Sequence, residues 1–287
     1  WDVALMQEVG EALGATCVDE DVSVLLGPGM NIKRNPLCGR NFEYFSEDPF
    51  LNGHIAANLV NGIQSQGVGA CLKHFAVNNQ ELGRMYMDAI VDDRALREIY
   101  LRGFEIAVKT AKPWTVMCAY NRLNGVFCSE HDWLLNTVLR EEWGFDGAVM
   151  TDWGAANDRP LGVKAGLDLE MPSSGGINDA LVAQAVKDGT LDEADLDRAI
   201  ARNITLSLSS LNRQKPAAPA DSDAQHALAR KAAAHSCVLL KNTDRVLPLS
   251  AQTRVALIGA FADTPRFQGA GSSQVRPTRV ETLRAAL

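Results

Sequence analysis

Short apolar runs that alternate with amphipathic helical segments constrain the fold of this chain more than any other feature. We predict strands at residues 22–26, 69–72, 115–120, 148–150 and 166–170. The segments between them carry apolar residues at helical spacing, for example Leu96, Tyr100, Phe104 and Val108. This alternation is typical of a parallel sheet covered by helices, so the predicted fold class is α/β.

Helices are predicted from spacing and from their start signals. We expect them at 3–13, 50–63 and 224–234, among others. Ser129 with Asp132, and Thr190 with Glu193, have the spacing of a capping box, in which the hydroxyl accepts a backbone N–H of the first helical turn. We therefore expect Ser129 and Thr190 to cap helices.

A Pro- and Ala-rich stretch divides the chain into two parts. Residues 213–223 are a linker by composition, so we predict one domain at 1–212 and the beginning of a second at 224–287, with a strand at 255–259. The first domain carries fewer strands than the eight that close a (β/α)8 barrel. We expect the missing strands to lie upstream of Trp1.

Composition and charge exclude several classes of partner. The net charge is −7 and the pI is about 5.3, which argues against nucleic acid and against anionic membranes. No apolar run is long enough to span a bilayer. We therefore expect neither a nucleic acid nor a membrane as a partner, while a homo-oligomer stays open.

The cysteines and loops give no reason to expect a metal or a cofactor. The six cysteines are scattered, which favours buried free thiols and a reducing, cytoplasmic location. The pair Cys128 and His131 is too small a set to hold a metal. The loop at 269–273 lacks the Lys and Ser/Thr ending of a phosphate-binding loop.

An acid follows the apolar strand at 148–150. The carboxyl ends of strands carry the chemistry of parallel α/β proteins, and Asp152 lies at such an end. Trp153 offers an apolar face for a sugar ring, and Gly154 lets the backbone turn. The alternative is that Asp152 is only the N-cap of the next helix.

Several motifs occur in the order known from one enzyme family. They are Gly27-Pro28-Gly29-Met30-Asn31-Ile32, Gly39-Arg40-Asn41-Phe42-Glu43, Phe45-Ser46-Glu47-Asp48-Pro49, Lys73-His74-Phe75 and Thr151-Asp152-Trp153-Gly154. Together they resemble glycoside hydrolase family 3, over nearly the whole chain. The resemblance implies a partial TIM-type (β/α)8 barrel followed by the start of an α/β sandwich domain.

The resemblance also implies an activity and a set of site residues. It implies retaining hydrolysis of terminal β-D-glucosidic bonds through a covalent glycosyl-Asp intermediate, with Asp152 as the catalytic nucleophile. The substrate would be a small β-glucoside or an oligosaccharide. The substrate-binding residues that it implies are Arg40, Lys73, His74, Tyr120, Trp153 and Met117.

Alternatives remain for the chemistry and for the sugar. Lys73 at a strand end could form a Schiff base, although the neighbouring His74 favours the sugar interpretation. Residues 76–81 lack the Gly-His loop of the family's N-acetylglucosaminidases, which favours the β-glucosidase branch over that activity, while a β-xylosidase stays an alternative. Among the other acids, we interpret Glu43 and Asp48 as structural partners and Glu170 as a candidate acid at the site rim.

The proton donor is not found in this sequence. In the family it is a Glu of the second domain, and no matching segment occurs before Leu287. General acid catalysis typically contributes about 10² to 10⁴-fold. We therefore expect the complete protein to be active, and these residues alone to fold poorly and to behave as a catalytically silent carbohydrate-binding or structural fragment.

Overall fold

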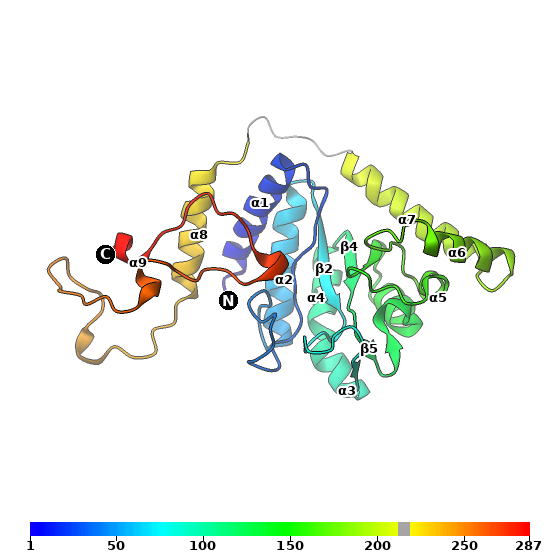
Figure 1. Ribbon diagram of the computed structural model, residues 1–287, viewed down its shortest axis with the longest axis horizontal. Coiled ribbons are helices and arrows are strands. Elements are labelled where there is room, and N and C mark those ends of the chain that lie inside the picture. Colours follow the sequence, from blue (N-terminus) through cyan, green and yellow to red (C-terminus); the bar gives the residue numbers. More distant parts are fainter. Residues whose placement is uncertain (212–218) are drawn as a thin grey trace. The chain divides into compact units, whose positions relative to one another are not determined.

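The computed structural model describes residues 1–211 and 219–287 (Figure 1). By its internal contacts the chain divides into two units, residues 1–232 and 233–287. Residues 213–218 of the predicted linker lie outside the described residues, and the domain boundaries at 212 and 224 stay predictions. The candidate site lies entirely in the first unit.

A parallel sheet forms the centre of the first unit. Its strands, in order across the sheet, are β1 (Val24–Leu25), β2 (Gly69–Phe75), β4 (Thr115–Cys118) and β7 (Ala148–Thr151). All neighbouring strands run parallel, and helices separate them along the chain. The α/β class is confirmed. The strand predicted at 166–170 is reduced to one bridge between Met150 and Leu169.

Helices begin where the sequence supplies acidic caps. The helical elements of this part are α1 (Val3–Asp19), α2 (Pro49–Ser65), α3 (Asp93–Ala95), η1 (Leu96–Tyr100), α4 (Arg102–Ala111), η2 (Cys128–Glu130), η3 (Trp133–Glu142) and α5 (Arg159–Lys164). The side chains of Asp2, Asp48 and Asp92 each accept a backbone N–H of the helix that they precede. Each cap satisfies a donor that has no partner inside the helix.

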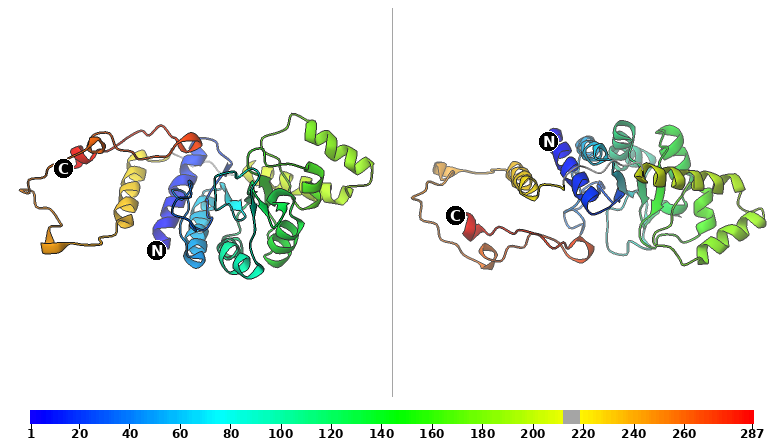
Figure 2. Two further views of the ribbon diagram at one scale, coloured as in Figure 1. Left: turned by 60° about the horizontal axis from the view of Figure 1, so that its bottom comes forward. Right: turned by 90° about the horizontal axis from the view of Figure 1, so that it is seen from above.

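Helices α1 and α2 lie side by side (Figures 1 and 2). Glycines make this close packing possible. A Cβ added at Gly10 would lie 2.5 Å from the backbone oxygen of Leu59, and one added at Gly62 would lie 2.3 Å from that of Gln7. Any larger residue at either position would push the two helices apart.

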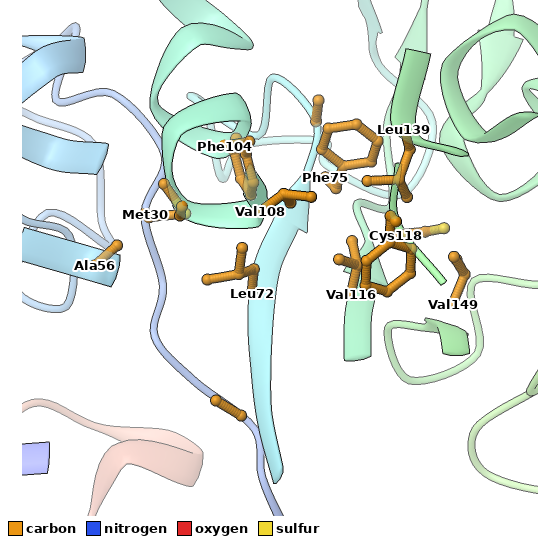
Figure 3. Close-up of a cluster of buried hydrophobic side chains, with 14 of the residues drawn as sticks. Met30, Ala56, Leu72, Phe75, Phe104, Val108, Val116, Cys118, Leu139 and Val149 are labelled. Atoms are coloured by element: carbon orange, nitrogen blue, oxygen red, sulfur yellow. The ribbon is translucent and has the colours of Figure 1, made fainter. Parts of the chain in front are cut away.

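The two faces of the sheet bury different side chains. On the helix-covered face, β2, β4 and β7 contribute residues to the main core, in which Figure 3 shows Leu72, Phe75, Phe104, Val108, Val116, Cys118 and Val149. On the other face Cys71, Met117 and Met150 pack together. Successive strand residues point to opposite faces, so these three side chains form one layer on the face opposite the helices.

A small second sheet lies beside the first and was not predicted. It consists of β3 (Asp88–Ala89), β5 (Arg122–Leu123) and β6 (Val126–Phe127). The antiparallel pair β5–β6 is joined by Asn124 and Gly125, both with positive φ, at 50° and 95°. Asn-Gly between strands is a strong hairpin signal.

Both predicted capping boxes are wrong. The Ser129 hydroxyl donates to the backbone oxygen of Ala155 at 2.7 Å, and the Thr190 hydroxyl donates to that of Ala185 at 3.2 Å. Asp132, which precedes η3, makes no capping bond. In the described part of the chain, neither hydroxyl accepts a backbone N–H of the helix that follows, so neither side chain is the predicted cap.

The C-terminal part is helical at first and then irregular. Its elements are α6 (Ile177–Lys187), α7 (Glu193–Leu211), α8 (Ser222–Ser236), η4 (Thr243–Arg245), η5 (Ala260–Ala262), η6 (Gly271–Ser273) and α9 (Leu283–Ala286). Helix α8 confirms the prediction at 224–234. The strand predicted at 255–259 is not formed, and residues 219–287 contain no strand at all. A strand needs a neighbour for its backbone hydrogen bonds, and this segment has none.

Candidate active site

Asp152 lies directly beyond the carboxyl end of β7. The residue is 9% exposed. Its Oδ1 accepts the Trp153 N–H at 2.7 Å, whereas its buried Oδ2 has no hydrogen-bond partner. Gly154 follows with a φ of +78°, a conformation that favours glycine. One carboxylate oxygen is therefore held by the backbone, and the other is left unbonded.

The helix-cap interpretation of Asp152 does not fit the structure. The next helix, α5, begins at Arg159, and its N-cap is Asp158. The Asp158 side chain accepts the Leu161 N–H at 2.9 Å. Asp152 lies outside this helix and makes no such bond, so its position needs another explanation.

His74, near the end of β2, faces Asp152. Its Nε2 lies 3.5 Å from Asp152 Oδ2, and its ring is almost completely buried. Burial lowers the pKa of His74 well below its usual value of about 6.5, and the positive charges of Arg40, Lys73 and Arg84 act in the same direction. The imidazole is therefore neutral at neutral pH.

Two cations are anchored next to this pair by Glu43. Arg40 Nε donates to Glu43 Oε1, and Lys73 Nζ lies 3.8 Å from Glu43 Oε2. All three side chains remain partly exposed. Glu43 is thus a structural partner of Arg40, and Asp48 caps α2, as the sequence predicts for both acids.

Tyr120 and Trp153 also lie near Asp152. Tyr120 Oη donates to the backbone oxygen of Trp153 at 2.9 Å. Burial, followed by the nearby Asp152 charge, raises the pKa of Tyr120 to about 12. The Trp153 side chain is 43% exposed. It offers an open apolar face beside the carboxylate.

The sequence did not single out Arg84. Its guanidinium lies 4.8 Å from the centre of the Tyr120 ring, and it pairs with Glu81 at 2.7 Å. It comes from an irregular loop that follows the Lys73-His74 motif, where no periodicity marks a residue. The one available signal is that a loop after a strand end tends to carry functional residues.

Met117 and Glu170 contact residues that are not among the predicted site residues. Met117 is buried in the layer with Cys71 and Met150, and its substrate-binding role stays a prediction. Glu170 Oε1 accepts the side-chain N–H of Asn178 at 2.6 Å. The direct contacts at the site form three groups: His74 and Trp153 contact Asp152, Tyr120 contacts Trp153 and Arg84, and Arg40 and Lys73 pair with Glu43.

This arrangement suits a neutral, hydroxylated ring. Arg40 and Lys73 supply charged donors for hydroxyl groups, and a charged donor makes the stronger kind of hydrogen bond. Trp153 supplies an apolar face, and Asp152 supplies a carboxylate oxygen without a partner. Within residues 1–211 and 219–287 no group of three or more His, Cys, Asp or Glu is arranged to hold a metal ion.

The helices of residues 1–211 and 219–287 can be compared with the length and apolar composition that a membrane-spanning helix needs. None of the helices there is both long enough and apolar enough to cross a bilayer.

Among the described cysteines none forms a disulfide, and Cys71, Cys118 and Cys128 are buried as expected, whereas Cys237 is exposed.

Sequence comparisons identify related proteins. The glycosyl hydrolase family 3 N terminal domain matches residues 1–206, and the family 3 C-terminal domain matches residues 237–287. The thermostable beta-glucosidase B of Acetivibrio thermocellus is 59% identical over 283 residues. The exo-alpha-(1->6)-L-arabinopyranosidase of Bifidobacterium longum is 50% identical over 297 residues. Each alignment covers 99% of this chain and 38% of the relative.

Solved structures have the same fold. Beta-glucosidase 3B from Thermotoga neapolitana, in complex with alpha-D-glucose, superposes with a TM-score of 0.94 at 46% identity, covering 99% of this chain and 41% of that one. The GH3 beta-glucosidase of Bifidobacterium adolescentis gives 0.94 at 49% identity, covering 99% and 42%. The likeness confirms the predicted fold, a partial (β/α)8 barrel followed by the start of an α/β sandwich domain.

Proposed function

Because the chain belongs to glycosyl hydrolase family 3, we propose that the complete protein is a retaining β-glucosidase with Asp152 as its nucleophile. In the retaining mechanism one carboxylate attacks the anomeric carbon and forms a covalent glycosyl intermediate. A second carboxyl group protonates the leaving oxygen and later activates water. Asp152 is the residue to which we assign the attack.

The unbonded Oδ2 of Asp152 is the observation that carries this proposal. A nucleophile needs an available lone pair, and a buried carboxylate oxygen without a hydrogen-bond partner is rare in folded proteins. The Trp153 N–H holds Oδ1 at 2.7 Å, so the orientation of the carboxylate is fixed. Oδ2 is then the oxygen that attacks the sugar.

The neighbouring cations support a sugar-binding role. Arg40 and Lys73 keep their positions by pairing with Glu43, and each retains further N–H groups for sugar hydroxyls. The neighbouring His74 and Asp152 favour this role for Lys73 over the Schiff-base alternative. We assign the proton donor to a part of the protein downstream of Leu287.

The sugar that the complete protein prefers is determined by experiment. One relative is named an arabinopyranosidase and is 50% identical, so an α-L-arabinopyranoside is the second candidate substrate. A panel of aryl glycosides tested on the complete protein decides between them. It includes the β-glucoside, the α-L-arabinopyranoside, the β-xyloside and the N-acetyl-β-glucosaminide, and the highest kcat/KM identifies the substrate.

Covalent trapping tests the nucleophile directly. We expect a dinitrophenyl 2-deoxy-2-fluoro-β-glucoside to inactivate the complete protein and to label the peptide that contains Asp152, as read by mass spectrometry. Asp152→Asn should take up no label. Asp146→Asn, at an exposed position of the same segment, should be labelled like wild type. A label on another carboxylate overturns the assignment.

A further inference from the structure

The polar groups behind His74, on the side away from Asp152, form a connected set that the proposed reaction does not use. Asn31 binds the backbone of His74 twice: Asn31 Nδ2 donates to the His74 oxygen at 2.9 Å, and the His74 N–H donates to Asn31 Oδ1 at 2.8 Å. Both residues are buried. The His74 peptide is therefore fixed, and only the ring can adjust.

Each ring nitrogen of His74 faces a different group. Nδ1 lies 3.1 Å from the hydroxyl of Tyr44, while Nε2 lies 3.5 Å from Asp152 Oδ2. The ring is 1% exposed and Tyr44 is 3% exposed, so water does not compete for these contacts. A neutral imidazole has one donor and one acceptor nitrogen, and the neighbours decide which is which.

The neighbours of Tyr44 fix the direction of its hydroxyl proton. Asn78 Nδ2 lies 3.4 Å from the Tyr44 oxygen and 3.2 Å from Glu81 Oε1, and an amide N–H group can only donate. The Tyr44 oxygen accepts from Asn78, so its own proton points to His74 Nδ1. Burial raises the pKa of Tyr44 well above its usual value of about 10, so the hydroxyl keeps this proton.

The opposite tautomer is disfavoured at both nitrogens. A proton on Nδ1 would compete with the Tyr44 proton. The other acceptor near Nδ1 is Asn31 Oδ1, which lies 3.4 Å from Nδ1. This oxygen already accepts the backbone N–H of His74. The lone pair of Nε2 would then face the Asp152 carboxylate, which is repulsive.

We propose that Tyr44 is a positioning residue that holds His74 in the tautomer protonated on Nε2. The Nε2–H then points to Asp152 Oδ2 and to the place that the sugar occupies beside it. When Oδ2 bonds to the anomeric carbon, this N–H remains directed at the reacting centre and away from the core. This inference rests on the proposed role of Asp152.

A double-mutant cycle in the complete protein tests the role of Tyr44. We expect Tyr44→Phe to lower kcat by roughly 10- to 100-fold, the range known for partners that orient a functional histidine, with KM changed far less. His74→Gln keeps an N–H near the Nε2 position and has no atom at Nδ1. In that background Tyr44→Phe should have almost no further effect, because coupled residues are not additive.

Tyr86→Phe is the matched control, since it also removes one tyrosine hydroxyl but at a position that is 73% exposed. It should behave like wild type. Wild-type kinetics for Tyr44→Phe, or losses for Tyr44→Phe and His74→Gln that simply add, overturn the proposal.

A measurement on the wild-type protein covers the case in which Tyr44→Phe does not fold. With ¹⁵N-labelled histidine, the His74 signals are identified by their loss in His74→Gln. We expect Nδ1 to show the shift of an unprotonated nitrogen and Nε2 that of a protonated one, and the reverse pattern overturns the proposal. Trapping with the 2-fluoro glycoside separates the two hypotheses. A label elsewhere than Asp152 refutes the nucleophile, whereas a label on Asp152 with the reverse tautomer refutes only the role of Tyr44.

Discussion

Two buried aspartates, Asp152 and Asp168, lie close to β7 and have opposite surroundings. The Asp168 side chain is fully buried and accepts from Arg140 at 2.7 Å, from the Val149 N–H at 2.7 Å and from Arg202 at 3.0 Å. Asp152 Oδ1 accepts the adjacent Trp153 N–H, whereas Oδ2 lies 3.5 Å from Nε2 of the neutral His74 and makes no short hydrogen bond among the described residues. The sequence marks both as acids near a strand end.

The difference shows how partners separate a structural acid from a reactive one. Both oxygens of Asp168 are used, and its two arginines come from η3 and α7, so this carboxylate joins those elements to β7. A buried ion pair of this kind is costly to break, because the remaining charge has no partner. Asp152 lies next to the neutral His74 and keeps one oxygen without a short hydrogen bond among the described residues. We therefore expect the two positions to control different properties.

Removal of the Asp152 carboxylate should give the largest effect. We expect Asp152→Asn to lower kcat of the complete protein on the order of 10⁴ to 10⁶-fold, the scale on which loss of a nucleophile or its activating partners acts. Its free energy of unfolding should stay near wild type, because no ion pair is lost. Rates on an aryl glucoside and urea unfolding measure the two quantities. If Asp152→Asn lost as much unfolding free energy as an Asp168 variant, Asp152 would be a structural acid like Asp168.

Asp168→Ala should show the reverse pattern. We expect a loss of about 3 to 5 kcal/mol in unfolding free energy, because Arg140 and Arg202 keep their buried charges without the carboxylate. The folded fraction should keep a near-normal kcat, measured at low temperature. Asp146→Ala, at an exposed position, should change stability by less than about 0.5 kcal/mol. A stable but inactive Asp168→Ala would contradict the structural role.

Cations of the two regions sharpen the same contrast, because Arg40 and Lys73 pair with Glu43 in the candidate site and Arg140 pairs with Asp168. We expect Arg40→Ala and Lys73→Ala each to lower kcat/KM, because charged hydrogen bonds to the sugar are lost. The loss of transition-state stabilisation should be roughly 2 to 4 kcal/mol for each variant. Arg140→Ala, next to Asp168, should reduce stability and leave kcat/KM close to wild type. Steady-state kinetics with the preferred aryl glycoside measure the effect. Near-normal kinetics for Lys73→Ala would refute its sugar-binding role.

The smallest effect concerns the neutral histidine that faces Asp152. The folded-state pKa of His74 is depressed, so below about pH 6.5 the unfolded chain binds a proton that the folded chain does not. Stability that is present above pH 6.5 is therefore lost as the pH falls toward the folded-state pKa, by up to about 1.4 kcal/mol per pH unit. His74→Gln should reduce this slope.

Unfolding curves at pH 7, 6 and 5 give the slope of the unfolding free energy against pH. It should not vanish in His74→Gln, because burial also lowers the pKa of His131 and acts with the same sign. An unchanged slope in His74→Gln would mean that His74 does not take part in the linkage.

Much of the fold follows from local pattern. The strands β1, β2, β4 and β7 lie where apolar runs predict them, because a buried parallel strand needs apolar residues on both faces. Asp48 and Asp92 stand before helices and cap them. The β5–β6 hairpin also has a local signal, because Asn124 and Gly125 form a dipeptide that favours a tight turn between strands.

Other features had no local signal. Ser129 fits a capping pattern but bonds to the Ala155 carbonyl, which only the folded chain brings near, whereas Thr190 bonds to the Ala185 carbonyl five residues earlier. Residues 255–259 have the pattern of a strand but lack a neighbour to pair with. For Ser129 and for residues 255–259, tertiary contacts or their absence decided the local structure.

For the site, the sequence by itself determined which residue types lie at the strand ends, because motif and strand position place Asp152, Lys73 and His74 there. The tertiary structure alone decided which acid keeps an unbonded oxygen, which cations share Glu43, and that Tyr44 lies behind His74. Tyr44 and His74 are far apart in the chain, and no periodicity links a loop residue to a ring nitrogen. Hydrogen-bond partners depend on distances of a few ångströms in three dimensions, and only the packing of the loops against the sheet sets them.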